Sequence, residues 1–139
     1  HWEALSPLAL KLASRESRCA LAASMGAAAA LLEPRDTQGP TRTSAAALVS
    51  LTAWSTTTVD EPDYEARLRG YATLLPATWA RMRRTCCLPL LFAALHDARD
   101  GSDLALRQAA AQALERFMAA ASDEDRELNR DALRAPQDP

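Results

Sequence analysis

The sequence has few of the residues from which sheets are built. It contains no isoleucine, and Val49 and Val59 are its only valines. Because strands favour β-branched aliphatic side chains, a β-sheet fold is disfavoured. There are only 4 glycines, and the 8 prolines lie mostly between Ala/Leu-rich segments, where proline starts or interrupts helices. With 139 residues, the chain is predicted to form one all-α domain over residues 1–139.

A strong charge imbalance and a long apolar run are also missing. The formal net charge is -2 at pH 7, so there is no large basic field to attract a phosphate backbone. The longest run of small residues, 20–32, is interrupted by Ser24 and Gly26 and falls short of the roughly 18 apolar residues of a membrane span. We therefore expect neither nucleic acid nor membrane as a partner. Because the chain opens with His1 rather than Met, we expect it to be a fragment of a longer chain.

The cysteine pattern gives no disulfide framework and no metal site. There are 3 cysteines, an odd number, and Cys86 and Cys87 are adjacent. A reducing compartment is therefore expected, and the predicted location is the cytoplasm, with the nucleus as a further possibility. Cys87 and His96 are roughly 13 Å apart along a continuous helix, too far for a catalytic pair with Asp97. Without paired Cys or His spacings we predict no metal. The Asp, Glu and Arg residues fall in predicted turns and on outer faces and do not converge among apolar residues, so we predict no cofactor and no enzymatic activity.

Apolar spacings of three and four residues predict six helices that pair as three antiparallel hairpins. Each helix has a plausible start signal, a hydroxyl side chain or a proline. The predicted helices are a short one after Ser6-Pro7, one from Ser14 or Ser17 to Leu32, one from Thr43 or Ser44 through Trp54, one from Pro62 through Leu75, one from Pro76 to Leu95 with a bend or restart at Pro89, and one from about Ser102 to Ser122.

The stretch 88–118 carries a known repeat pattern. A Leu-Pro-Leu-Leu helix, 88–91, is followed after an Asp-containing turn by a hydrophobic residue, Arg107, a pair of alanines and Leu114. This stretch resembles the HEAT repeat, in which two helices of a hairpin stack on neighbouring hairpins. Such hairpins do not bury their apolar faces alone and assemble into a solenoid. The resemblance implies a HEAT-like α-solenoid.

A second copy of the same pattern lies near the start of the sequence. Pro7 and the leucines after it precede Arg18, and Met25 follows Arg18 by seven positions, as Leu114 follows Arg107. The copy departs from the repeat at Ser17, where a hydrophobic residue is expected. Pro7, Arg18, Pro89 and Arg107 are therefore predicted to occupy structural repeat positions, with each arginine pairing to a carboxylate or to a turn carbonyl.

The stretch 63–82, "DYEARLRGYATLLPATWARM", carries a more specific resemblance. Its Glu-Ala-Arg-Leu at 65–68 and its Thr-Trp-x-Arg at 78–81 resemble the C-terminal part of the family of the second Tel-interacting protein, a HEAT-repeat subunit of the Triple-T co-chaperone complex. This resemblance implies a scaffold that binds a larger helical-repeat subunit. It also implies a role, with the Hsp90 machinery, in the maturation and stability of phosphatidylinositol-3-kinase-like kinases.

The sequence offers one candidate group for partner binding, Trp79 with the nearby Arg81, Arg83 and Arg84. Tryptophan and arginine are enriched at interface hot spots. The same residues suit single-stranded nucleic acid, but the negative net charge favours a protein partner.

Other interpretations stay open. Ser122 begins an acidic segment that is typical of a helix cap, and it also has the acidic residue three positions downstream that acidophilic kinases favour. For the whole chain, the alternatives to a co-chaperone scaffold are a generic HEAT-type adaptor in transport or trafficking and a small α-helical ligand-binding domain or enzyme.

Overall fold

The structure is a computed structural model in which residues 2–100 and 103–134 are described. These residues form helices and, apart from an isolated bridge between Trp54 and Pro62, no β structure. The predicted all-α class is therefore confirmed for the described residues. The helices are α1 (Trp2–Leu5), α2 (Leu8–Lys11), α3 (Arg15–Leu32), α4 (Pro40–Leu51), α5 (Tyr64–Ala72), α6 (Pro76–Arg81), α7 (Arg84–Asp100) and α8 (Leu104–Arg134).

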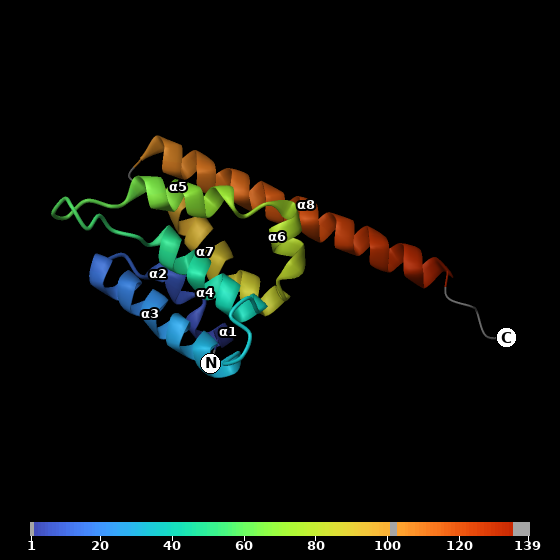
Figure 1. Cartoon of the computed structure of the whole chain (residues 1–139). Helices are drawn as coiled ribbons and strands as arrows, with labels where there is room; N and C mark the ends of the chain where they lie inside the picture. Colours follow the sequence, from blue (N-terminus) through green and yellow to red (C-terminus); the bar gives the residue numbers. More distant parts are fainter. Residues whose placement is uncertain (1, 101–102, 135–139) are drawn as a thin grey trace.

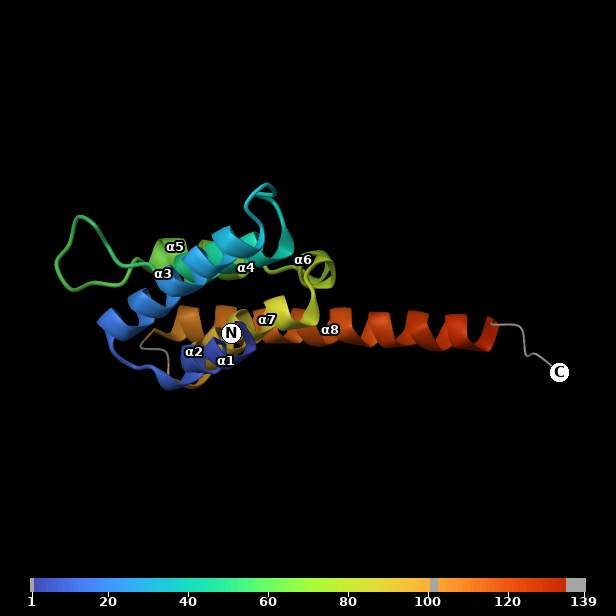
Figure 2. The same ribbon diagram turned by 90° about the horizontal axis from the view of Figure 1, so that it is seen from below.

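The helices are arranged in two layers, as Figures 1 and 2 show together. One layer contains α3, α4 and α5 side by side, and the other contains α1 and α2, then α7, then α8. The layers meet mainly where α4 packs on α7 and where α5 packs on α8. The short helix α6 crosses between the layers at one end and packs on α8.

The predicted stacking of three hairpins into a solenoid is not confirmed. In a stack of helical hairpins, each hairpin contributes one helix to each layer. Here α2 and α3 do lie in different layers, but α4 and α5 share one layer and α7 and α8 share the other. In addition, α2 makes most of its contacts with α7, far away in sequence, rather than with α3.

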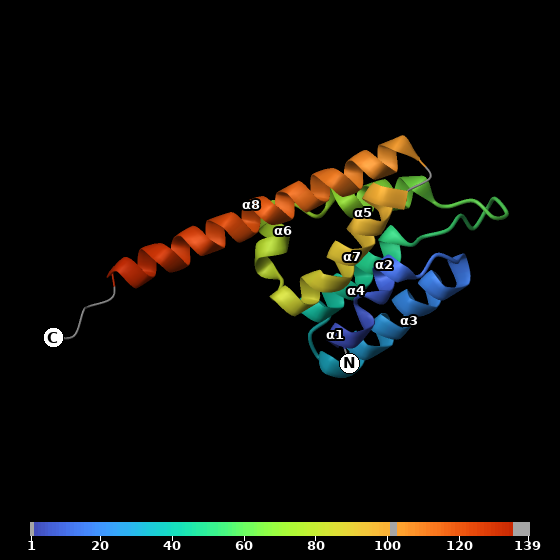
Figure 3. The same ribbon diagram turned by 180° about the vertical axis from the view of Figure 1, so that it is seen from behind.

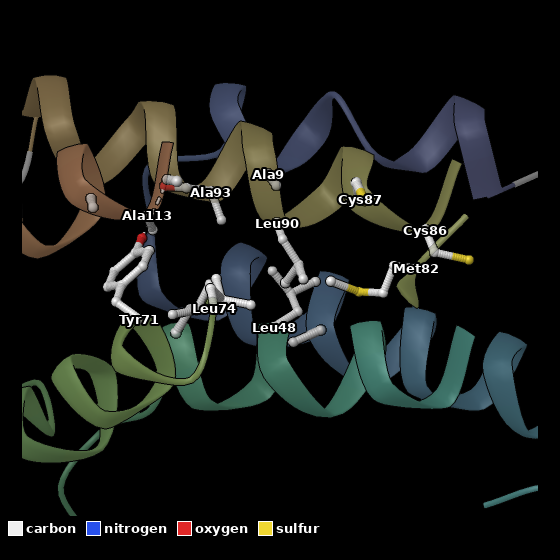
Figure 4. Close-up of a cluster of buried hydrophobic side chains, with 14 of the residues drawn as sticks. Ala9, Leu48, Tyr71, Leu74, Met82, Cys86, Cys87, Leu90, Ala93 and Ala113 are labelled. Atoms are coloured by element: carbon white, nitrogen blue, oxygen red, sulfur yellow. Dashed lines mark hydrogen bonds between the residues drawn. The ribbon is translucent and has the colours of Figure 1, made fainter. Parts of the chain in front are cut away.

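The core lies between the two layers. Figure 4 shows Leu48 of α4 and Leu90 of α7 pointing toward each other, with Leu74 and Met82 beside them. Leu48, Leu74 and Leu90 are each 1% exposed or less. Alanines on α7 and α8, among them Ala93 and Ala113, are also fully buried. Small side chains here let the helix backbones approach closely without leaving voids.

The helix starts agree with the sequence only in part. Ser14 caps α3, because its hydroxyl oxygen accepts a hydrogen bond from the Ser17 backbone N–H at 3.2 Å. Ser6 was predicted to cap the helix that follows it, but its buried hydroxyl instead donates to the Trp2 carbonyl at 2.7 Å. The predicted third helix begins earlier than Thr43, at Pro40 in the first turn of α4, and it ends before Trp54.

The predicted fourth and fifth helices also have different bounds. The carboxylate of Asp63 caps α5 by accepting from the Ala66 backbone N–H at 3.0 Å, and Leu75 lies beyond the end of that helix. The single helix predicted from Pro76 to Leu95 is two helices. Its break lies at Met82, whose ψ of 142° is extended, and not at the predicted bend of Pro89.

Pro89 lies inside α7 and is fully buried. Because proline has no backbone N–H, the Thr85 carbonyl one turn earlier lacks its helical donor. The indole N–H of Trp2 donates to this carbonyl at 3.0 Å. A side chain from α1 therefore satisfies the acceptor that Pro89 leaves open, and it ties α1 to α7.

The last helix is much longer than predicted. α8 begins after Asp103, whose carboxylate accepts from the Leu106 backbone N–H at 3.1 Å. The predicted start at Ser102 lies outside the described residues. The helix continues to Arg134, so Ser122 lies within it and caps no separate helix, which corrects that prediction. Its C-terminal part extends beyond the other helices (Figure 3). In the part of the chain that the structure describes, no helix is long and apolar enough to cross a membrane.

Candidate functional site

The residues predicted to bind a partner lie around the junction of α6 and α7. Arg81 ends α6, and Arg83 and Arg84 follow the break at Met82; all three arginines are exposed. Trp79 is only 2% exposed and packs edge-on against Phe117 of α8, with ring centroids 5.2 Å apart. Trp79 is therefore a core residue, and the prediction that it lies on a binding surface is corrected.

A small hollow adjoins Trp79 between α6, α7 and α8. It has a volume of about 130 Å³ and is bordered by Arg83, Arg84 and Glu124 as well as by apolar side chains. Among the described residues, the indole N–H of Trp79 is a buried donor without an acceptor. Leaving a buried donor unsatisfied costs free energy, so the aromatic packing of Trp79 must outweigh that cost.

The four predicted repeat positions have different surroundings. Pro7 immediately precedes α2 with a helical φ of -63°, and Pro89 is buried in α7. Arg18 lies in α3, and its Nη1 donates to the carbonyls of Ala9, at 2.7 Å, and of Leu12, at 2.9 Å. These bonds hold the C-terminal end of α2 against α3. Arg107 is exposed on α8.

A polar cluster joins α3, α5 and α7 next to Arg18. The Tyr71 hydroxyl donates to the carboxylate of Asp97 at 2.5 Å, and both residues are buried. Burial, and then the nearby charge of Asp97, raise the pKa of Tyr71 well above its ordinary value of 10.0. Burial also lowers the pKa of Arg18, although the charge of Asp97 opposes this shift. The sequence analysis considered Asp97 only as a partner of His96 and missed this cluster.

Trp54 is the second feature that the sequence analysis missed. The guanidinium groups of Arg15 and Arg67 lie over its ring, 4.6 Å and 5.3 Å from the centroid, as in cation–π contacts. The Arg67 Nε also donates to the Ala53 carbonyl at 2.9 Å. These contacts fix the base of the long loop between α4 and α5. No local sequence signal pairs residues that are about 40 positions apart.

A groove of about 490 Å³ runs along α4 and α5. Along α4, and along α5 with its C-cap Thr73, the lining residues recur at spacings of three, one and three, the spacing of one helix face. Arg69 is the one charged residue among those that line it. The lining residues are Thr43, Ala46, Ala47 and Ser50 from α4, Ala66, Arg69 and Gly70 from α5, the C-cap Thr73 and Leu74 after α5, Thr78 from α6, and Met82.

The adjacent thiols lie in the core. Cys86 is 4% exposed and Cys87 is 2% exposed, and burial raises the pKa of the Cys87 thiol to about 11. A thiol with a raised pKa is a poor nucleophile at neutral pH. His96 lies elsewhere on α7, with its Nδ1 3.2 Å from the Leu10 carbonyl oxygen. The structure therefore does not bring the Cys, His and Asp residues into one site.

The described residues thus form an all-α protein of two packed helical layers, with a groove along α4 and α5. The chain belongs to the family described as U3 small nucleolar RNA-associated protein 20, N-terminal, which it matches over residues 1–135. No curated protein and no solved structure matches the chain. The match does not test the resemblance to the family of the second Tel-interacting protein, which stays a prediction.

Proposed function

We propose that the chain is a non-enzymatic helical scaffold segment that binds a helix of a partner protein in the groove between α4 and α5. The groove supports this proposal most directly, because its two walls follow helix faces and consist largely of small side chains. The family name supports the setting: we propose that the scaffold works in an assembly associated with U3 small nucleolar RNA, and therefore in the nucleus.

The groove has the features of a helix-in-groove site. An amphipathic helix binds such a groove through residues spaced by three and four positions. Alanine, serine, threonine and glycine walls let a partner backbone come close, and at Gly70 α5 packs so closely on α4 that an added Cβ would lie 3.0 Å from Leu51 Cδ2. Arg69 is exposed and lies among these walls, so an acidic residue on the polar side of the partner helix suits the site.

A protein partner fits the chain better than direct contact with RNA. The net charge of the chain is -2, whereas nucleic-acid sites rely on clustered Lys and Arg. The arginines beside Trp54 are engaged, Arg15 with Asp60 at 3.2 Å and Arg67 with a backbone carbonyl. We therefore propose that the RNA of the assembly is reached through other subunits.

The experiment is affinity purification of the full-length protein from cells, with mass spectrometry of the proteins and quantification of U3 small nucleolar RNA. Ala46→Arg fills the groove at an exposed position, and Ala23→Arg places the same side chain at an exposed position on α3, outside the groove. We expect Ala46→Arg to reduce a specific protein partner and the U3 RNA, while Ala23→Arg retains both. Equal recovery with both variants would contradict the groove proposal.

The co-chaperone scaffold is the second proposal, supported by the resemblance of residues 63–82 described above. It predicts that the purification recovers a larger helical-repeat subunit, Hsp90 machinery and large kinases, and that Arg81→Glu weakens their recovery. Recovery of transport or trafficking factors would instead favour the general adaptor. Recovery of U3 RNA in the purified material would favour the scaffold of a U3-associated assembly over the co-chaperone scaffold and over the general adaptor.

A further inference from the structure

The loop between α4 and α5 is the most prominent irregular segment of the described chain. It leaves the helices and returns at the bridge between Trp54 and Pro62 (Figure 1). The Ser55 backbone N–H donates to the Glu61 carbonyl at 2.9 Å, which closes the base of the loop. Residues 56–61 are all exposed, and Val59 is 86% exposed. An enzyme that modifies side chains therefore has access to this loop.

Of the three consecutive threonines of the loop, Thr57 and Thr58 differ in the hydrogen bonds of their hydroxyl groups. The Thr57 hydroxyl lies 3.2 Å from the Ser55 hydroxyl, within hydrogen-bond distance. The Thr58 backbone N–H donates to the Ser55 hydroxyl at 3.1 Å, but within the described part of the chain the Thr58 hydroxyl has no hydrogen-bond partner. The Thr58 side chain is thus exposed and ready to react without first breaking a bond.

Two carboxylates follow Thr58 at the positions that an acidophilic protein kinase recognises. Asp60 is two residues downstream and Glu61 is three residues downstream. We propose that Thr58 is a phosphorylation site for an acidophilic Ser/Thr kinase, and that Arg15 pairs with the phosphate. In the transfer, the Thr58 Oγ1 bonds to the γ-phosphorus of ATP, the bond from that phosphorus to the bridging oxygen breaks, ADP leaves, and the hydroxyl proton passes to the kinase.

Arg15 is placed to receive the new charge. It borders, together with residues 55–60, a hollow of about 240 Å³ on the inner side of the loop. Its Nη1 now pairs with Asp60 Oδ1 at 3.2 Å, and this contact is exposed, with 84% of the Asp60 side chain accessible. A phosphate carries more charge than a carboxylate and more acceptor oxygens, so it competes well for Arg15.

Ser122 provides an internal comparison. Asp125, an acidic residue, lies three positions downstream of Ser122. The Ser122 side chain is exposed, but Ser122 lies within α8. Kinases bind their substrates as extended segments, which a loop supplies and a continuous helix does not. The folded chain is therefore phosphorylated at Thr58 and not at Ser122, although the two local sequences are similar.

The experiment treats the folded full-length protein with a purified acidophilic Ser/Thr kinase and ATP, and maps phosphate by mass spectrometry. We expect the phosphate on Thr58, its loss in Thr58→Ala and Glu61→Gln, and its retention in Thr56→Ala. A synthetic peptide spanning Ser122 is phosphorylated by the same kinase, whereas Ser122 in the folded chain is not. Phosphate on Ser122 but not on the loop, or an unmodified folded chain with a modified peptide, would overturn the proposal.

A second measurement tests the role of Arg15. The phosphorus NMR signal of the phosphorylated chain is followed against pH in the wild type and in Arg15→Gln. A neighbouring guanidinium favours the dianion, so the second pKa of the phosphate is expected below its usual value of about 6, and the substitution returns it to that value. Identical titrations of the two proteins would refute the pairing with Arg15.

Discussion

Gly26 and Gly70 show how the same residue type has different roles in two helices. Both lie inside helices, where glycine is about 1 kcal/mol less favourable than alanine. At Gly26 in α3, an added methyl group meets nothing within 4 Å. At Gly70 in α5, it would lie 3.0 Å from Leu51 Cδ2 and 3.2 Å from Ser50 Cβ. Gly70 is thus required for the close approach of α5 to α4, and Gly26 is not required for packing.

We therefore predict that Gly26→Ala raises the free energy of unfolding by about 1 kcal/mol, the difference in helix propensity. Gly70→Ala is expected to gain nothing, because the added methyl group crowds α4. Chemical denaturation of the two variants and the wild type measures both effects. If the two substitutions stabilised the protein equally, the close approach of α5 to α4 would be refuted.

The buried thiol of Cys87 predicts a loss of stability at alkaline pH. Its pKa rises from 9.0 to about 11 on folding, so below pH 9 the thiol is protonated in both states and the stability is complete. Between pH 9 and 11 the unfolded chain loses the proton while the folded chain keeps it, which favours unfolding by about 1 to 3 kcal/mol.

The measurement is the free energy of unfolding of the wild type and of Cys87→Ala as a function of pH. The substitution removes a buried sulfur and lowers stability at every pH, but it also removes this titration. The difference between the two proteins should therefore shrink as the pH rises from 9 to 11. A constant difference would show that the thiol does not titrate differently on folding.

At the scale of the element, proline and the capping residues predicted some of the helix starts, and interior breaks were harder to place. Ser14 caps α3 as expected, and Pro76 opens a helix. No restart occurs at Pro89, because α7 continues through it. The Trp2 indole donates to the Thr85 carbonyl that Pro89 leaves without a helical donor, and Trp2 is 83 residues away from Thr85. The real break at Met82 has no proline or glycine to mark it. Ser122 was interpreted as a cap because local sequence does not show that α8 continues.

The contact between Trp2 and Pro89 can be tested with a double-mutant cycle. Trp2→Phe removes the indole N–H and leaves the Thr85 carbonyl without that donor, so we expect a loss of about 0.5 to 1.5 kcal/mol in the free energy of unfolding. Pro89→Ala restores the helical N–H of α7. In the Pro89→Ala variant, Trp2→Phe should therefore lower the free energy of unfolding by less than it does in the wild type. Additive losses would show that the two positions are not coupled.

At the scale of the whole molecule, composition predicted the all-α class and spacing predicted most of the helices, but neither predicted how the helices pair. A helix face that suits one neighbour suits others of similar shape, so spacing alone does not distinguish a hairpin across the layers from two helices in one layer. α4 and α5 illustrate this. A hairpin of the predicted solenoid would place these two helices in different layers, but they lie side by side in the same layer. Their side-by-side packing creates the groove, which the sequence analysis therefore missed.

The surroundings of the candidate site residues could be predicted only where the residues that meet are close in sequence. Arg81, Arg83 and Arg84 are exposed near one another as their spacing suggests, but Trp79 turned out to be buried because Phe117 of α8 covers it. Arg15 and Trp54, like Tyr71 and Asp97, meet only after the layers have formed. Long-range contacts of this kind leave no periodic signal in the sequence.

The most direct test of the proposed scaffold role places a photo-crosslinking amino acid at Ala46 in the full-length protein in cells, with Ala23 as the matched control position. Both positions are exposed, and only Ala46 lines the groove. We predict that light links Ala46 to a helical segment of one protein that is found with U3 small nucleolar RNA, and that Ala23 gives no such product. The same products from both positions, or direct crosslinks from Ala46 to RNA, would contradict the proposal that this groove binds a partner helix.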